Sequence, residues 1–298
     1  MNMRSLSRRL LDVAFVASIV AAVLPAADAR AASVDASAPA VVAARKLVPA
    51  DVRSKGTLVA AMPLDYEPYN FLDDKNEQLG LDVDLFHSIA EVLGLKPEIQ
   101  RMGFASVIPS VTGGRVDVGM SAMSILKPRL KVVSFVRYSH ANQGLVVSKG
   151  NPAGVSTGNA CGHTIALEKG TQPFLYWQDY AARCEAEGKP KMTLLVFDGK
   201  GPQMLAVESG RAEAFGVGYA TATIAGKHSG GKLETAPGGP APGGNVETGI
   251  VYAKTQPQLG PAIEAALKVL VANVDYAQIF AKWGLSDLTE TPAIIAEE

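Results

Sequence analysis

VTGGRVDVG, residues 111–119, and VESGRAEAF, residues 207–215, share one layout: a helix end, a glycine stop and a short strand. Apolar helical runs precede both stretches, at residues 108–109 and 204–205. Two similarly wound α/β lobes are the simplest explanation for a helix-to-strand unit that recurs at two distant places. The repeat therefore predicts an α/β protein with two lobes.

Apolar patterning elsewhere in the chain also alternates between strand and helix signals. Short apolar runs bounded by turn residues predict buried strands at residues 56–62, 144–147, 165–167, 194–197 and 249–253. One helical face is formed by Leu85, Ile89, Val92 and Leu93, and Gly94 is expected to end that helix. We expect later helices at residues 263–270 and 276–283, and a Pro- and Gly-rich solvent loop at residues 235–245 that could rim a pocket.

The composition limits the possible classes of function. The 298 residues can form one large domain or two moderate ones, each able to bury a hydrophobic core. Hydrophobic residues make up 48% of the chain and charged residues 19%, which argues against a disordered chain. The formal net charge of -1 argues against the basic surface with which proteins bind nucleic acid. We therefore expect a globular protein without a nucleic-acid partner.

The first 29 residues have the pattern of a signal peptide. Arginines at positions 4, 8 and 9 precede an apolar run over residues 13–24 and small residues at 27–29. The apolar run is shorter than the roughly 20 residues that a membrane-spanning helix needs. No cysteine that could carry a lipid anchor lies near the expected cleavage site. We expect a freely diffusing periplasmic protein that begins with a loosely ordered lead-in over residues 30–53.

Cys161 and Cys184 are the only cysteines of the chain. An even number of cysteines in an exported protein favours a disulfide bond. Because the closed loop holds about two dozen residues, the chain-entropy model assigns the bond roughly 3 kcal/mol. The spacing is not the Cys-x-x-Cys of a redox centre, so the predicted role is structural.

The segment GLDVDL, residues 80–85, resembles the signature of the family 3 extracellular solute-binding proteins, the polar amino-acid binders of ABC transporters. Further landmarks resemble the family in the same order along the chain: DYEPYNF at 65–71, Phe104 with Ile108-Pro109, GRVD at 114–117, residues 124–129, VSF at 133–135 and IFAKWG at 279–284. The resemblance covers about residues 50–290, and it rests on the order of these motifs rather than on any single one.

This resemblance implies a two-lobed periplasmic-binding-protein-like fold of type II, with a ligand cleft between two α/β lobes. The two strands that cross between the lobes are expected near residues 138–142 and 247–249. Lobe 1 would then comprise residues 54–142 and 248–298, including a C-terminal tail, and lobe 2 would comprise residues 143–247. Both cysteines fall within lobe 2, so their bond would leave the hinge free to move.

The resemblance also assigns candidate ligand-binding residues. Arg129 matches the arginine that family members direct at the ligand carboxylate, which a guanidinium can bind through two hydrogen bonds. Tyr66 and Phe104 match positions where aromatic rings enclose the ligand. Further candidate contacts are Ser124, Ala122, Thr171 and Gln172. Ser124 could instead cap a helix. Thr171 and Gln172 are expected at the start of a helix of lobe 2, whose free backbone N–H groups could bind a carboxylate oxygen of the ligand.

One position departs from the family pattern. Amino-acid binders of this family present an acidic residue to the α-ammonium of the ligand, and Gly218 stands at that place in this chain. A buried ammonium without an anion is costly. Either another carboxylate therefore serves, or the ligand lacks the ammonium group. Glu168 is the nearest substitute, and Asp65 and Glu67 are further options.

Other functions remain open on the same fold. A cyclohexadienyl-dehydratase-like enzyme would need a general acid, for which Glu168 is the candidate, and a ligand-sensing protein would differ only in its membrane partner.

As the receptor of an importer, the chain would need a permease and a separate ATPase, because it has no GxxxxGK[ST] motif. We expect a monomer without cofactor or metal, since the four histidines lack metal-ligand spacing. GVSTG at residues 154–158 lacks the flanking strand and helix of a nucleophile elbow.

Overall fold

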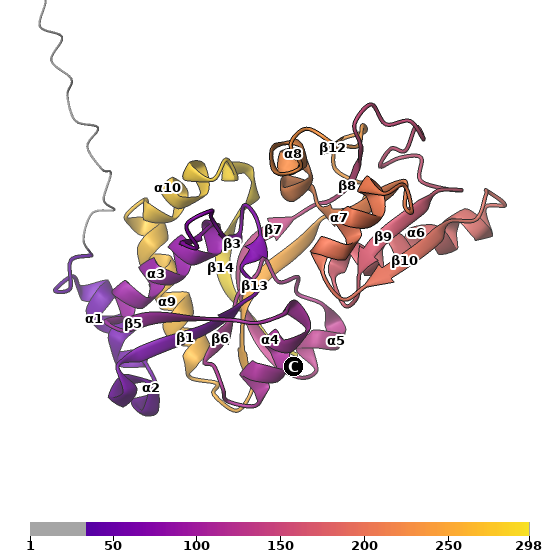
Figure 1. The fold of residues 1–298 in the computed structure, drawn as a ribbon. Coiled ribbons are helices and arrows are strands. Elements are labelled where there is room, and N and C mark those ends of the chain that lie inside the picture. The colour runs from indigo at the N-terminus through magenta and orange to yellow at the C-terminus, as the bar shows by residue number, and fades with distance from the viewer. Residues whose placement is uncertain (1–33, 298) are drawn as a thin grey trace, which may run out of the picture. The chain divides into compact units, whose positions relative to one another are not determined.

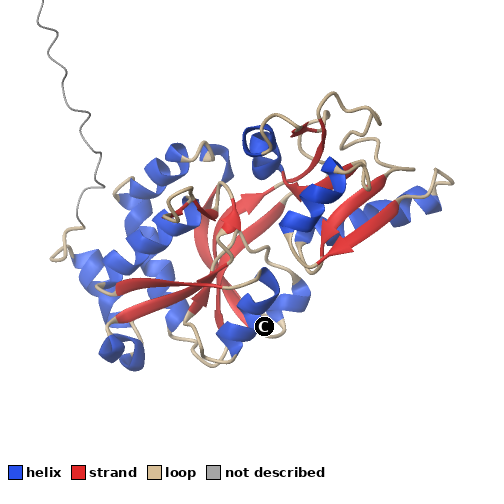
Figure 2. Cartoon of the chain, viewed as in Figure 1, coloured by secondary structure: helices blue, strands red, loops and turns tan. Residues whose placement is uncertain are grey.

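The computed structural model describes residues 34–297. The predicted signal peptide, residues 1–29, and the start of the predicted lead-in, residues 30–33, lie outside the described residues. Within the described part, helices and strands alternate along most of the sequence (Figures 1 and 2). No helix of this part is both long enough and apolar enough to span a bilayer.

A six-stranded sheet forms the centre of one lobe, with the strand order β14-β7-β13-β6-β1-β5. Its strands are β1 (Thr57–Met62), β5 (Lys96–Arg101), β6 (Val118–Gly119), β7 (Val133–Ala141), β13 (Val246–Ala253) and β14 (Thr289–Ile295). β1 pairs in parallel with β5 and β6, whereas β13 is antiparallel to β6 and β7. The last two strands of the chain therefore return to the sheet that the first strands build.

Helices cover both faces of this sheet. They are α1 (Pro39–Leu47), α2 (Ala50–Lys55), α3 (Leu81–Leu93), α4 (Phe104–Thr112), α5 (Lys127–Leu130), α9 (Leu259–Ala272) and α10 (Asp275–Lys282), with a 3-10 turn at Ser286–Leu288. Side chains of β1 alternate between the faces. Leu58 and Ala60 join a cluster with α1, α3, α9 and α10, while Val59 and Ala61 join one with α4 and α5 (Figure 1).

A five-stranded sheet forms the centre of the other lobe, with the order β10-β9-β11-β8-β12. Its strands and helices are β8 (Gln143–Ser148), β9 (Thr164–Glu168), α6 (Gln172–Ala186), β10 (Thr193–Phe197), α7 (Lys200–Glu208), β11 (Ala214–Gly218), α8 (Tyr219–His228) and β12 (Leu233–Thr235). Leu145 and Val147 of β8 pack with Trp177 of α6, and Val146 packs on the opposite face with Ala206 of α7. This lobe also has helices on both faces.

Two segments connect the sheets. β7 leads through Asn142 into β8, and β13 begins at Val246 after the loop that follows β12. The two segments are antiparallel, with Ala141 opposite Val246. They lie where the resemblance places the crossing strands. Below, lobe 1 denotes the parts built on the six-stranded sheet, residues 34–141 and 246–297, and lobe 2 denotes residues 142–245.

Most elements expected from the sequence are present. The five predicted strands coincide with β1, β8, β9, β10 and β13. The four apolar residues of the predicted helical face are buried in α3, and Gly94 ends this helix with a φ of 71°. Both repeated units run from a helix, α4 or α7, through a glycine turn to a strand, β6 or β11. The observed loop begins at residue 236, one residue later than predicted, because Thr235 still belongs to β12 and pairs with Val146 of β8.

The prediction of a loosely ordered lead-in over residues 30–53 is wrong for its described part, which forms α1 and most of α2. Val41 and Ala44 of α1 are buried in the cluster that includes α3 and α9. Arg45 of α1 donates from Nε to the carbonyl oxygen of Val92, 2.9 Å away, near the end of α3. Val41 and Ala44 are spaced as on one face of a helix, but the helices that bury them, α3 and α9, come much later in the chain.

The C-terminal residues form a strand where a tail was expected. Ile294 and Ile295 of β14 lie opposite Val136 and Phe135 of β7 in the antiparallel register. Because β7 is the strand that continues toward lobe 2, the C-terminus flanks one of the two connections between the lobes.

The expected disulfide bond between Cys161 and Cys184 is present. Cys161 precedes β9 and Cys184 lies in α6, so the bond ties the start of a strand to the helix that packs on it. Both residues belong to lobe 2, and neither lines the cavity described next.

Candidate ligand-binding site

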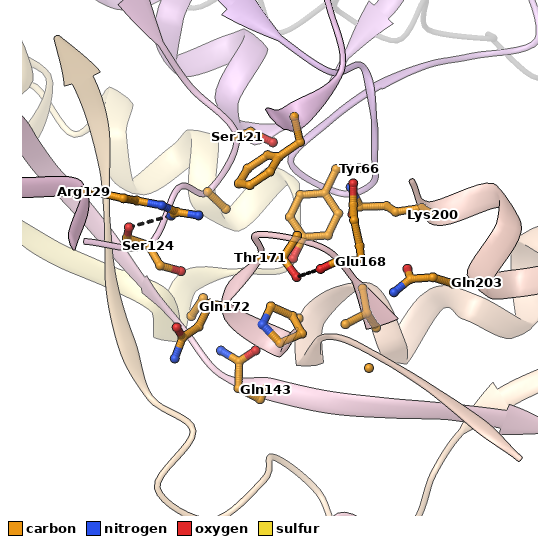
Figure 3. Close-up of a pocket in the computed structure, with 17 residues that line it drawn as sticks. Tyr66, Ser121, Ser124, Arg129, Gln143, Glu168, Thr171, Gln172, Lys200 and Gln203 are labelled. Atoms are coloured by element: carbon orange, nitrogen blue, oxygen red, sulfur yellow. Dashed lines mark hydrogen bonds and ion pairs between the residues drawn. The ribbon is translucent and has the colours of Figure 1, made fainter. Parts of the chain in front are cut away.

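A cavity of about 50 Å³ lies between the two lobes (Figure 3). It is lined by nearly all the predicted site residues: Tyr66, Phe104, Ala122, Ser124, Arg129, Glu168, Thr171, Gln172 and Gly218. Polar residues that the sequence did not single out also line it: Ser121, Gln143, Lys200 and Gln203. Asp65 lies outside this wall. The structure therefore gathers the predicted residues in one place, and their binding of a ligand stays a prediction.

Arg129 enters the cavity from the short helix α5, whose first turn contains Pro128. Its guanidinium donates to the carbonyl oxygen of Ser124 (Nη1–O 2.8 Å) and, across the cleft, to that of Gly170 (Nη2–O 2.8 Å). Arg129 is only 9% exposed, and burial lowers its pKa to about 10. No described carboxylate forms an ion pair with it. A cation is thus buried in the wall with only neutral partners.

Two aromatic rings line the cavity, and one of them lies beside Arg129. Phe104, the first residue of α4, has its ring centre 5.4 Å from the Arg129 Cζ atom. Tyr66 lies in a small antiparallel sheet of β2 (Asp65–Tyr66), β3 (Asn70–Leu72) and β4 (Gln78–Leu79), and it stacks on Tyr69 with ring centres 5.1 Å apart. Phe104 therefore lies beside the guanidinium, whereas Tyr66 lines the cavity next to Lys200.

A buried carboxylate holds the Ser121–Ser124 segment in place from behind. Asp82 accepts hydrogen bonds from the Tyr138 hydroxyl (2.5 Å), the Asn70 amide (3.0 Å) and the backbone N–H of Ala122 (3.0 Å). Asn70 also donates to the Ser121 hydroxyl at 3.2 Å. Satisfied polar networks of this kind fix a unique local geometry. Ser124 itself forms a bridge with Thr248 and is not a helix cap, since α5 begins after Leu126.

We expect Asp82 to make stability depend on pH. Burial raises its pKa to about 6, against 3.8 for an exposed aspartate. Because the folded state then holds the proton more tightly, this group favours folding most below pH 3.8, and the contribution is lost as the pH rises through 6. Wild type should therefore lose melting temperature relative to Asp82→Asn between pH 4 and 7. If the difference in melting temperature between wild type and Asp82→Asn did not vary with pH, Asp82 would not have a raised pKa in the folded protein.

On the lobe 2 side, the loop after β9 leads into α6 beside the cavity. Thr171 is the N-cap of α6: its hydroxyl accepts from the Phe174 N–H (3.4 Å) and donates to the Glu168 carbonyl oxygen (2.7 Å). Gln172 is the first residue of the helix, and both residues line the cavity. The positive end of a helix of 15 residues thus borders the space where Arg129 lies.

Lys200, the first residue of α7, is the main site residue that the sequence reading missed. Its Nζ lies 3.2 Å from Oε2 of Glu168 and 3.4 Å from Oδ1 of Asp65, and 4.5 Å from the centre of the Tyr66 ring. Glu168 and Asp65, two of the proposed partners for a ligand ammonium, are therefore already paired with a protein ammonium. No motif of the sequence around Lys200 points to this pairing, because Asp65 lies far away in the chain.

The structure gives a physical reason for the glycine at position 218. A Cβ atom there would lie 2.4 Å from the hydroxyl oxygen of Tyr66, which is far closer than atoms can approach without displacement. Tyr66 comes from lobe 1 and Gly218 from the end of β11 in lobe 2. An acidic side chain at 218 is therefore incompatible with Tyr66 in its present position.

Two lobes around a cavity that both of them line, with a buried cation in its wall, define a ligand-binding protein of the hinged type. The family model of the bacterial extracellular solute-binding proteins, family 3, matches residues 58–286. The chain belongs to this family. The family and the fold predicted from the sequence are thereby confirmed.

Individual relatives agree with this assignment. The arginine-binding protein ArgT of Corynebacterium glutamicum is 27% identical over 256 residues, which are 85% of this chain and 82% of the relative. A crystallised mutant of ArgBP from T. maritima is 28% identical, with a TM-score of 0.69 over 81% of this chain and 99% of that one. The ancestral amino acid-binding protein AncCDT-1, a precursor of cyclohexadienyl dehydratase, has a TM-score of 0.63 over 78% of this chain and 97% of its own. At 24% identity, this last likeness concerns the fold alone.

Proposed function

We propose that the protein is the periplasmic receptor of an ABC importer and captures an amino acid or a related small carboxylate. The observation that carries the proposal is the buried guanidinium of Arg129, whose protein hydrogen bonds go to two carbonyl oxygens. A ligand carboxylate would supply the missing counter-charge in a geometry that suits a guanidinium. The arginine-binding relatives support a ligand that carries such a carboxylate.

Hydrogen bonds between the lobes support a site that forms when the two lobes close around the ligand. Arg129 of lobe 1 bonds to Gly170 of lobe 2, and the Thr221 hydroxyl of lobe 2 donates to the Glu67 carbonyl oxygen of lobe 1 at 2.7 Å. A ligand held by both lobes favours the closed state by the difference between its affinities for the two states. The closed form would then dock on a permease.

Family membership supports export and the need for membrane partners. Family 3 proteins are extracellular solute-binding proteins, and the signal-peptide pattern of residues 1–29 supports export to the periplasm. The chain would act as a monomer and rely on a separate membrane permease and ATPase. A ligand sensor would use the same cleft and differ in its membrane partner alone.

A thermal-shift screen of amino acids, betaines, opines and other small carboxylates tests the proposal. Ligand at 100 times its dissociation constant stabilises the folded state by roughly 2.7 kcal/mol, so a true ligand should raise the melting temperature clearly. Methyl esters or amides of each hit serve as controls, because they lack the carboxylate. A screen in which no carboxylate raises the melting temperature would contradict the proposal.

The dehydratase alternative has less support. A general acid must carry a proton to give, whereas the one cavity-lining carboxylate of the described residues, Glu168, is ion-paired with Lys200. The curated relatives carry binding-protein names. Incubation with prephenate or arogenate, followed by absorbance of an aromatic product, checks this alternative. Turnover would replace the receptor proposal.

A further inference from the structure

The charges in the cavity wall do not suit a ligand with a positive group. Among the described residues that line the cavity, Arg129 and Lys200 are cationic and Glu168 is the one anionic residue. In Figure 3, Arg129 and Lys200 lie on opposite sides of the Tyr66 ring. A cation placed between them would meet Arg129 on one side and, on the other, a carboxylate that is already paired with Lys200. The wall is complementary to a ligand with a net negative charge.

The one anion of the wall is already neutralised by the protein. Glu168 is 7% exposed, and its carboxylate lies 3.2 Å from Nζ of Lys200, which also lies 3.4 Å from Asp65. Burial lowers the pKa of Lys200, but the nearby carboxylates of Glu168 and Asp65 outweigh burial, so its pKa is raised overall. Lys200 therefore stays an ammonium, at the place beside Glu168 where a ligand ammonium could have bound.

A second acid cannot take over this role from the facing strand. The Tyr66 hydroxyl lies where a side chain at position 218 would begin, 2.4 Å from the Cβ position. The ring of Tyr66 itself stacks on that of Tyr69 and contacts the ammonium of Lys200. The part of the wall opposite Arg129 thus offers a tyrosine hydroxyl and an occupied ion pair.

The polar groups of the wall that still lack partners are uncharged. Gln143 and Gln203 are only 2% and 1% exposed, yet Oε1 of the first and Nε2 of the second have no hydrogen-bond partner among the described residues. Oε1 of Gln172 is likewise unpartnered. Buried polar atoms are normally satisfied, so these amides await groups of the ligand. A hydroxyl group, which both donates and accepts, suits both kinds of amide atom.

We infer that the ligand is a carboxylate without a positive charge, whose other polar groups are neutral, as in a 2-hydroxy acid. Its carboxylate binds Arg129, a neutral hydroxyl or amide meets the glutamines, and Lys200 fills the place of a ligand ammonium beside Glu168. The inference rests on the proposed function, because it assumes a carboxylate at Arg129. It narrows that function to one class of ligand.

Matched pairs of ligands test the inference by titration calorimetry. Each pair shares an uncharged side chain and differs in a 2-hydroxyl or 2-amino group: lactate and alanine, 2-hydroxyisocaproate and leucine, phenyllactate and phenylalanine. We expect the hydroxy acid of the best-binding pair to bind at least about 10-fold more tightly, since a buried unpaired ammonium easily costs the 1.4 kcal/mol that this ratio represents. Tighter binding of the amino acid in that pair would overturn the inference and leave the receptor function intact. If neither class binds, the receptor function itself fails.

A substitution at Lys200 tests the reason for this preference. Lys200→Met frees Glu168 for a ligand ammonium, so the ratio of amino-acid to hydroxy-acid affinity should rise at least about 10-fold relative to wild type. Lys191→Met is the matched control, because Lys191 is an exposed, ion-paired lysine of the same lobe, and it should leave the ratio unchanged. If Lys200→Met does not fold, Lys200→Gln replaces it. An unchanged ratio in the folded variant would show that Lys200 does not set the ligand class.

Discussion

Replacing Arg129 by alanine should weaken binding of the tightest carboxylate by roughly 30-fold or more. The guanidinium is buried, and its protein partners are the carbonyl oxygens of Ser124 and Gly170. A ligand carboxylate would form the one full ion pair of this cation, and removing one partner of a buried pair costs about 2–5 kcal/mol. Titration calorimetry at fixed pH and ionic strength measures the loss directly.

Two further variants define the cause of this loss. Arg129→Lys keeps the charge but not the planar pair of donors, so its affinity should fall between those of wild type and Arg129→Ala. Lys127→Ala removes an exposed cation from the same short helix and should leave the affinity unchanged. Equal losses for Lys127→Ala and Arg129→Ala would mean that the general positive potential, and not a direct contact, attracts the ligand.

Loss of the disulfide bond should lower the free energy of unfolding by roughly 3 kcal/mol, through the gain in entropy of the unfolded chain. The bond joins residues 23 positions apart, Cys161 and Cys184, and Cys184 is buried in the cluster around Trp177. Serine at both positions is the appropriate variant, since a single substitution would leave an unpaired thiol. Urea unfolding followed by tryptophan fluorescence gives the difference.

The same variant should bind ligand normally well below its melting temperature. Both cysteines lie in lobe 2 away from the residues that line the cavity, so closure needs no change in their positions. Addition of dithiothreitol to wild type should reproduce the stability loss, and it should have no effect on the serine variant. Equal stability of wild type and variant would refute a structural role for the bond.

The fold could be predicted well where its signals are local. The strand at β1, the helix face of α3 and the helix-glycine-strand repeat all depend on spacing within a dozen residues. α1 was missed because its buried face, which includes Val41 and Ala44, packs on helices far along the chain. β14 was missed for the same reason, since its partner is β7.

Many residues that line the cavity could be named from the sequence because they lie in motifs that resemble the family. Arg129, Tyr66, Phe104, Glu168 and the start of α6 all line one cavity. The Lys200 pairing and the contact that excludes a side chain at Gly218 could not be read from the sequence. Each depends on residues from both lobes that meet only in three dimensions. Asp65 does not itself line the cavity and is ion-paired with Lys200, which does, so its contact with a ligand stays a prediction.

The most direct test of the proposed binding site is a crystal structure of the wild-type protein with the tightest carboxylate from the screen. We expect the ligand to lie between the lobes, with its carboxylate within hydrogen-bonding distance of the Arg129 guanidinium and its body beside Tyr66 and Phe104. A ligand bound elsewhere, or bound in this cavity with its carboxylate away from Arg129, would contradict the proposed binding site.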